Sequence, residues 1–126
     1  MDYMHHAAAI IIKEKRVLLI ERADEESGKW CPPNETLEKG ETPESAVVRG
    51  ALEEVGLRFT IKQNLSHHTF NGHTTHVYLG NADGIIKLNP EEASDSGWFT
   101  FNEIKKLPMA FGYDLLMSRL HSEGYL

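Results

Sequence analysis

The stretch GETPESAVVRGALEEVGL, residues 40–57, constrains the fold more than any other part of the chain, because it carries signals for both ends of one helix. Thr42 is a favoured N-cap residue, and Pro43 suits the first helical position. Gly56 suits the left-handed position that ends many helices. The stretch therefore predicts one well-defined helix over residues 43–55.

Projected at about 3.6 residues per turn, this helix has an apolar arc and an opposite, more polar arc. The apolar arc, expected to face the core, comprises Val47, Val48, Ala51, Leu52 and Val55. The opposite arc comprises Ala46, Arg49, Gly50, Glu53 and Glu54. Gly50 lies one turn before the two glutamates and costs about 1 kcal/mol of helix stability relative to alanine. A helix with such good ends thus carries an unexplained weak point beside its carboxylates.

The rest of the chain predicts strands more often than helices. Strands are expected over residues 7–12, 16–21, 57–63, 65–70, 73–80, 85–88 and 97–101. Residues 13–15 and the pair Asn71-Gly72 predict turns, and residues 23–41 predict a long ordered loop. Two further helices are expected over residues 102–107 and 112–122. This order predicts an α/β (α+β) fold, a mixed sheet flanked by two or three helices, in a single domain spanning residues 1–126.

Composition and charge restrict the class of protein. The single cysteine, Cys31, excludes an internal disulfide, and together with the lack of a secretory signal pattern it favours the cytoplasm. No apolar run approaches the roughly 20 residues of a membrane helix, so we expect no membrane partner. The net charge of −6 argues against a stable nucleic-acid complex. An acidic protein that handles polyphosphates would need a bridging cation.

The polar arc of the central helix has two interpretations when it is considered alone. A solvated face is common, and Arg49 with Glu53 forms an ordinary i,i+4 pair. Adjacent glutamates on a rigid helix also supply oxygen ligands suited to Mg²⁺, which favours carboxylates together with substrate phosphates. Glu53 and Glu54 alone do not decide between these interpretations.

The surroundings of these glutamates resemble the signature of the Nudix family. The second half of that signature matches residues 49–57, RGALEEVGL, apart from Gly50, and seven residues separate Glu41 from Arg49 as the signature requires. Upstream, WCPPNETLEKGE at 30–41 is similar to the family's usual lead-in, and GETPESAVVR is close to the bacterial MutT type. The likeness covers nearly the whole chain.

This resemblance implies a Nudix fold, an α/β/α sandwich around a mixed sheet. It implies a hydrolase that cleaves a pyrophosphate bond in a small-molecule nucleotide, a nucleoside diphosphate linked to another group, with Mg²⁺ or Mn²⁺ as cofactor. Glu53 and Glu54 match the family's metal-binding glutamates, and Arg49 and Glu41 match the pair that braces the loop against the helix. The backbone carbonyl at Glu35 matches a further metal ligand. Family members are often homodimers.

Two positions depart from the signature. Glu35 stands where the box opens with glycine, and Gly50 stands where it has a glutamate that is a metal ligand or a base in family members. The helix then offers two carboxylates rather than three, so we expect hydrolysis to be reduced or to use a base from elsewhere. Asp95, three residues before Trp98, is the first candidate for that catalytic acid, and Glu92 is the second. The alternative is a catalytically weak or inactive nucleotide-binding or sensing module on the same fold.

Three further side chains are candidates for nucleotide contacts. Trp30 and Phe111 could stack on a base, and Arg22 could contact phosphate. Their plainer interpretations are core packing for the tryptophan and surface charge for the arginine. Phe111 stands roughly where the MutT type has an asparagine that contacts oxidised guanine, which argues against specific hydrolysis of oxidised guanine nucleotides. Four histidines flank the Asn71-Gly72 turn, and we interpret them as incidental residues of an exposed hairpin, because their spacing matches no metal-ligand pattern: His67, His68, His73 and His76.

Overall fold

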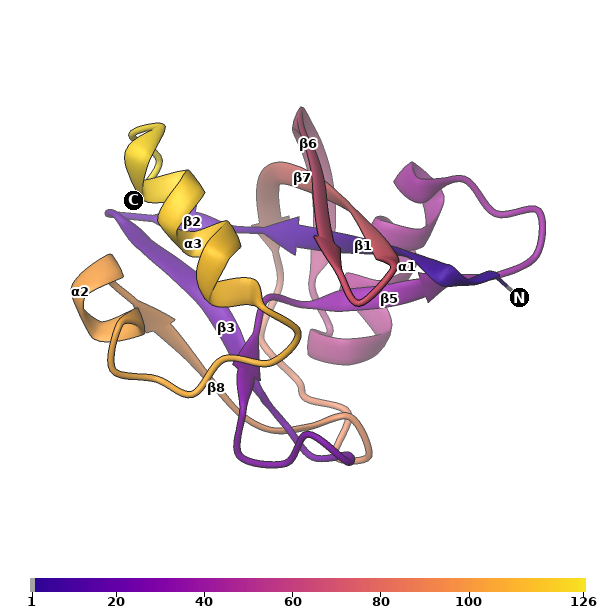
Figure 1. Ribbon diagram of the computed structural model, residues 1–126. Coiled ribbons are helices and arrows are strands. Elements are labelled where there is room, and N and C mark those ends of the chain that lie inside the picture. The colour runs from indigo at the N-terminus through magenta and orange to yellow at the C-terminus, as the bar shows by residue number, and fades with distance from the viewer. Residues whose placement is uncertain (1) are drawn as a thin grey trace.

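The computed structural model describes residues 2–126, and its elements are shown in Figure 1. The strands form two four-stranded sheets, and within these residues no helix has the length and apolarity needed to cross a membrane. In chain order the elements are β1 Asp2–Ile10, β2 Ile12–Lys13, β3 Arg16–Arg22, β4 Trp30–Cys31, β5 Asn34–Leu37, α1 Pro43–Val55, β6 Arg58–Phe70, β7 His73–Asp83, β8 Ala93–Phe99, α2 Phe101–Ile104 and α3 Tyr113–Ser122.

The first sheet is mixed and carries the site. Its strand order is β5-β1-β7-β6, in which β1 and β7 run parallel and the other neighbours run antiparallel. The second sheet is antiparallel, with β3 paired to β2, β4 and β8. Residues 7–11, the end of β1 and the residue after it, and residues 17–20 of β3 are at most 1% exposed, so the two sheets share one apolar core.

Helices α1 and α3 cover opposite faces of the first sheet. Helix α1 packs on β1, β5 and β6 and passes behind β5 in Figure 1, whereas α3 lies in front of the strands. Successive side chains of a strand point to opposite faces. On β5, Glu35 meets α1, while Asn34 and Thr36 line a pocket that also involves Tyr113 of α3. The expected mixed sheet between helical layers is confirmed. Strand β5 separates two compartments, the α1 side with Glu35 and the pocket side with Asn34 and Thr36.

Both predicted ends of α1 are confirmed. The hydroxyl of Thr42 accepts the backbone N–H of Ser45 at 3.1 Å, and Gly56 adopts a left-handed conformation with φ 72°. The predicted core arc is partly wrong, because Val48 and Leu52 are 39% and 60% exposed. Their places on the buried side are taken by Ala46, Gly50 and Glu54. The buried face of α1 includes the polar residue Glu54, so apolar residue type alone did not predict which face of the helix is buried.

The loop predicted over residues 23–41 contains two short strands. In the antiparallel β1–β5 pairing, Ala7 lies opposite Glu35, so β5 forms an edge of the first sheet. The sequence NETL has little strand propensity of its own, and pairing with the buried β1 supplies the order instead. The strand predicted over residues 85–88 is also absent from the described chain, where this segment is irregular. The strands predicted over 57–63 and 65–70 are one strand, β6, with irregular pairing between them.

Both predicted turns are confirmed. Glu14 and Lys15 have φ values of 52° and 61°, which is the left-handed geometry of a tight turn between β2 and β3. Asn71 and Gly72 have φ values of 49° and 79° and join β6 to β7. The second turn sets the register that places His67 opposite His76.

Candidate active site

Arg49 ties the segment before α1 to the helix itself. Its guanidinium donates two hydrogen bonds to the Glu41 carboxylate, from Nε to Oε2 at 2.8 Å and from Nη2 to Oε1 at 2.9 Å. The same Nη2 donates to the backbone carbonyl of Thr36 at 3.0 Å, which fixes β5 against α1. Such a two-point pair is strong and geometrically specific. The Arg49 guanidinium accordingly holds the pKa of Glu41 below its ordinary value.

Glu54 is a buried carboxylate in the last turn of α1. Only 2% of the residue is exposed, and its Oε1 accepts the backbone N–H of Asn34 on β5 at 3.0 Å. Burial raises the pKa of Glu54 to about 8, and the negative charges of Glu92 and Glu35 act in the same direction against the Asn34 hydrogen bond. A buried carboxylate needs a proton or a cation to offset its charge. The position is therefore suited to binding a positive ion.

Glu53 lies at the rim of the same site. Its side chain is 51% exposed, and its Oε2 lies 3.1 Å from Nη1 of Arg49. The two adjacent glutamates thus differ in environment, because Glu54 faces β5 and Glu53 faces solvent. A ligand that approaches from solvent would meet Glu53 before Glu54.

The 84–92 loop, between β7 and β8, brings a further acid to this place. The backbone N–H groups of Lys87 and Asn89 donate to the carbonyls of Val55 and Glu54, at 2.9 and 3.0 Å. The last carbonyls of a helix lack hydrogen-bond partners within the helix, and the N–H groups of this loop are their partners here. The loop then carries Glu92 toward the carboxylates of α1, where burial and the charge of Glu53 raise the pKa of Glu92.

Asp95, the first candidate for the catalytic acid, lies elsewhere. It is exposed on β8 opposite Glu21, and its carboxylate accepts the backbone N–H of Ser96 at 2.8 Å. The charge of Glu92 raises the pKa of both Glu54 and Glu35, so Glu92 is the loop acid that the fold brings to the site. The irregular path of the 84–92 loop explains the difference, since sequence distance from Trp98 does not determine which of these acids faces α1.

Glu35 and Gly50 meet where β5 crosses α1. A Cβ atom built on Gly50 would lie 2.6 Å from the Cβ of Glu35, closer than real Cβ contacts allow. The Oε2 atom of Glu35 lies 4.0 Å from Nη1 of Arg49, the nitrogen that also contacts Glu53. Burial and the charge of Glu92 raise the pKa of the Glu35 carboxyl, while the N–H of Thr36 and Arg49 act in the opposite direction. The space beside Gly50 is therefore filled by another carboxylate-bearing side chain.

This donor set fits a hard divalent cation. The Oε2 atom of Glu92 is buried and has no hydrogen-bond partner within the described residues. Carboxylate oxygens are the preferred protein ligands of Mg²⁺, which also keeps water or substrate oxygens in its shell. No three His, Cys, Asp or Glu side chains of residues 2–126 form a ready-made metal cage. Binding would therefore need the carboxylates to rotate toward one ion, with other oxygens completing its coordination.

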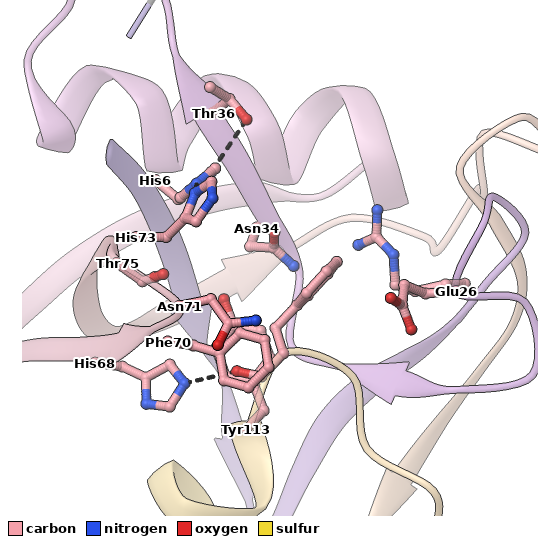
Figure 2. A pocket seen from close by; sticks show the side chains of 12 residues that line it. His6, Glu26, Asn34, Thr36, His68, Phe70, Asn71, His73, Thr75 and Tyr113 are labelled. Carbon is pink, nitrogen blue, oxygen red and sulfur yellow. Dashed lines mark hydrogen bonds between the residues drawn. The ribbon is translucent and has the colours of Figure 1, made fainter. Parts of the chain in front are cut away.

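A pocket of about 310 Å³ lies across β5 from the carboxylates (Figure 2). Its lining combines polar side chains of the first sheet, two charged side chains from the end of β3 and the loop after it, and aromatic side chains from the hairpin and the start of α3: His6, Arg22, Glu26, Asn34, Thr36, His68, Phe70, Asn71, His73, Thr75, Phe111 and Tyr113. The backbone N–H of Asn34 binds Glu54 while its side chain faces the pocket. One residue of β5 therefore connects the two compartments.

Two of the three candidate nucleotide contacts lie in this pocket. The guanidinium of Arg22 sits 5.0 Å from the ring centre of Phe111, a cation–π contact, and also pairs with Asp24. Burial raises the pKa values of Glu54 and Glu92, and the positive charge of Arg22 partly opposes this effect, so the arginine also influences the carboxylate site. Arg22 is partly buried rather than a free surface charge.

Trp30 is not brought into the pocket. Its ring packs edge-on against Phe99, with ring centres 5.1 Å apart, and it contributes to the core between β4 and β8. Its backbone N–H donates to the carbonyl of Pro108, and its own carbonyl accepts the N–H of Ala110. Trp30 thereby holds the segment before Phe111 in place, so its contact with the pocket is indirect.

The interpretation of the hairpin histidines as exposed is wrong for His68, which is buried, and for His73 and His76, which are half-buried; of the four, only His67 is exposed. His68 is 8% exposed, stacks on Tyr113 with ring centres 4.9 Å apart, and donates from Nε2 to the carbonyl of Phe111 at 3.0 Å. His73 lines the pocket, and its Nδ1 lies 2.8 Å from Nε2 of His6. The α3 layer covers this face of the hairpin, which strand alternation alone does not reveal.

Comparison with known proteins places these features in a family. The family profile described as the NUDIX domain matches residues 3–120. The chain is 29% identical over 102 residues to a MutT-like protein of Streptomyces ambofaciens, which covers 79% of this chain and 65% of that protein, less than two thirds of its length. It is 32% identical over 126 residues to the ADP-ribose pyrophosphatase of Methanocaldococcus jannaschii, covering 91% of this chain and 73% of that protein.

A solved structure shows the same arrangement of elements. The MutT NUDIX hydrolase from Burkholderia pseudomallei superposes with a TM-score of 0.76 at 26% identity, covering 93% of this chain and 97% of that one. With a family profile that spans residues 3–120 and a fold shared with solved members, the chain belongs to the NUDIX domain family.

Proposed function

We propose that this protein is a divalent-cation-dependent hydrolase that cleaves a pyrophosphate bond in a nucleoside diphosphate linked to another group, with Mg²⁺ or Mn²⁺ as cofactor. One observation carries this proposal: the buried carboxylate of Glu54 and the half-buried carboxylates of Glu35 and Glu92, which repel one another, lie across β5 from a pocket with aromatic and polar walls. Carboxylates that need a cation suit the phosphates of a substrate, and the pocket suits its nucleoside.

The pocket has the size and lining to hold a base and its sugar. Its volume of about 310 Å³ lies at the small end of the range typical of ligand sites. Phe111 offers a ring face for stacking, and the side chain of Asn71 offers both donors and an acceptor for base edges. Asn34 offers its amide oxygen as an acceptor, because its amide nitrogen already donates to the carbonyl of Pro32 at 2.8 Å. Arg22 lines the pocket and its charge acts on Glu54, and a phosphate oxygen would compete with Asp24 for its guanidinium.

The residues divide the chemistry as follows. Glu53 and Glu54 would hold the cation, and Arg49, bonded to Glu41 and to the Thr36 carbonyl, holds α1 against β5. When bound, the cation neutralises phosphate charge and lowers the pKa of a water molecule. Glu92 accepts the proton of the attacking water in place of Asp95, because its pKa is raised toward the working pH by burial and by Glu53.

A nucleotide panel with Mg²⁺ and with Mn²⁺ tests the proposal. The panel comprises ADP-ribose, nucleoside triphosphates and dinucleoside polyphosphates. ADP-ribose is included because the relative from Methanocaldococcus jannaschii is named an ADP-ribose pyrophosphatase. We expect turnover of at least one compound, and a loss of about 100-fold or more in Glu54→Gln and Glu92→Gln. Glu91→Gln, an exposed neighbour on the same loop, and Asp95→Asn are the matched controls and should keep activity.

The opposite result would identify a non-catalytic module. Nucleotide binding with no turnover of any compound, under both cations, would reject hydrolysis and favour a binding or sensing role. Turnover that survives Glu54→Gln would reject the assigned site. Turnover lost in Asp95→Asn but kept in Glu92→Gln would return the base to Asp95.

A further inference from the structure

The side chain of Glu35 fills the space that a side chain at position 50 would need. The Cβ of Glu35 sits where the side chain of residue 50 would begin, because a Cβ at position 50 would approach it to 2.6 Å. Gly50 is in the middle of α1, where no left-handed conformation requires glycine. Its lack of a side chain is therefore explained by the close approach of β5. A side chain at position 50 and the present Glu35 exclude one another.

The Glu35 carboxylate is directed toward the other acids of the site. Its Oε2 and the Oε2 of Glu53 both lie within 4.0 Å of the same nitrogen, Nη1 of Arg49. Its Oε1 accepts the backbone N–H of Thr36 at 3.1 Å, which leaves the second oxygen on the side of the guanidinium. The backbone of Glu35 is paired with Ala7 of β1, which fixes the position of its Cα and Cβ on the α1 side of β5.

We propose that the side chain of Glu35 is the third carboxylate of the cation site, delivered from β5 instead of from position 50 of α1. The two departures from the family signature are then one exchange, in which glycine and glutamate trade places across the contact between strand and helix. This inference rests on the proposed function and assigns a side-chain role to a residue that the family resemblance gave only a backbone role.

The exchange preserves the number of carboxylates while changing their support. Glu53 and Glu54 come from α1 and Glu35 comes from β5, and Arg49 holds the two elements together through Glu41 and the Thr36 carbonyl. A cation bound among these acids would bridge helix and strand. Three carboxylates also bind a small hard ion more firmly than two, so the site need not be weak.

Binding of Mn²⁺ alone, followed by the electron paramagnetic resonance signal of the free ion, tests the proposal without any nucleotide. Glu35→Gln keeps the size of the side chain and should weaken Mn²⁺ affinity by at least about ten-fold. Loss of a residue that only supports a metal ligand already costs about 10- to 100-fold in affinity, so loss of a direct ligand should cost no less. Glu38→Gln is the matched control, because this exposed acid lies 3.8 Å from the same Nη1 of Arg49 but away from Gly50. The control should bind Mn²⁺ as the wild type does, and equal affinity in Glu35→Gln would overturn the proposal.

The exchange can also be reversed. Glu35→Gly should weaken Mn²⁺ binding, Gly50→Glu should lower the melting temperature because the two side chains collide, and the double variant should recover both properties. A double variant that melts like the wild type but binds Mn²⁺ no better than Glu35→Gly would overturn the proposal. If the Gly50→Glu chains do not fold, the comparison of Glu35→Gln with Glu38→Gln decides alone.

The outcomes separate this inference from the proposed function. Mn²⁺ binding that depends on Glu35 in a protein without turnover would support the third carboxylate and reject the hydrolase. Turnover that depends on Glu54 but not on Glu35, with unchanged Mn²⁺ affinity in Glu35→Gln, would support the hydrolase and reject the third carboxylate.

Discussion

Glu54→Gln should stabilise the folded protein in the presence of EDTA while removing its function. The glutamine retains an oxygen for the N–H of Asn34, and its amide can donate to a neighbouring carboxylate such as Glu92. What it removes is a charge buried in a residue that is 2% exposed. Sites that bind ions or substrates commonly reduce stability in this way.

The magnitude follows from the pKa of Glu54. Burial raises this pKa from 4.5 to about 8, so between these pH values the folded state keeps a proton that the unfolded chain has released. The stability that Glu54 contributes is therefore fully present below pH 4.5 and is lost as pH rises through the window to about 8. Each pKa unit is worth about 1.4 kcal/mol, so about 3 kcal/mol of unfolding free energy is lost by pH 7. Glu54→Gln should recover that amount, which corresponds to roughly 10 °C in melting temperature.

Thermal unfolding followed by circular dichroism at pH 5, 7 and 8.5 in EDTA measures the effect. Wild type and Glu54→Gln should melt at similar temperatures at pH 5 and separate as pH rises. Addition of Mg²⁺ at pH 8.5 should raise the melting temperature of the wild type only. Glu53→Gln, whose side chain is 51% exposed, is the matched control and should follow the wild type in EDTA. A variant that melts below the wild type at pH 8.5 would refute the reasoning.

Three further predictions concern other parts of the structure. Arg49→Lys loses the two-point bond to Glu41 and the bond to Thr36, and should cost about 1–3 kcal/mol in urea unfolding; a variant as stable as the wild type would contradict the bracing role. Burial raises the pKa of Cys31 to about 12, so thiol reagents at pH 8 should modify the unfolded chain far faster than the folded protein. Burial and the charges of His67 and His5 lower the pKa of His76 against the effect of Glu44, so stability from this residue is present above pH 6.5 and lost as pH falls below it. His76→Thr should reduce the fall in melting temperature between pH 7 and 5, and an unchanged fall would count against this coupling.

Local signals predicted the parts of the fold that depend on local chemistry. Thr42 and Gly56 set the ends of α1, and Asn71-Gly72 set the hairpin, because capping and turn geometry are encoded within a few residues. The β5 strand was missed because its order comes from pairing with β1 rather than from its own sequence. Apolar residue type likewise misled the placement of Val48 and Leu52, since the sheet, not hydrophobicity, determines the buried face.

In the site, too, local sequence predicted some contacts, whereas others depend on the packing of distant segments. The bond between Arg49 and Glu41 could be predicted from the spacing of the signature, and the structure has it. The choice of Glu92 over Asp95 could not, because the approach of Glu92 depends on the 84–92 loop binding the last carbonyls of α1. Glu35 and Gly50 each looked like a loss when considered alone. Only the contact between β5 and α1 shows that one explains the other.

A crystal structure with Mn²⁺ and a non-hydrolysable nucleotide tests the central claim most directly. The anomalous signal of Mn²⁺ locates the ion without reference to the surrounding side chains. The account predicts an ion among Glu35, Glu53 and Glu54, with an oxygen of the Glu35 side chain at direct ligand distance, about 2.1 Å for an ion of this kind. An ion bound away from these carboxylates, or bound there with the Glu35 side chain turned aside, would contradict it.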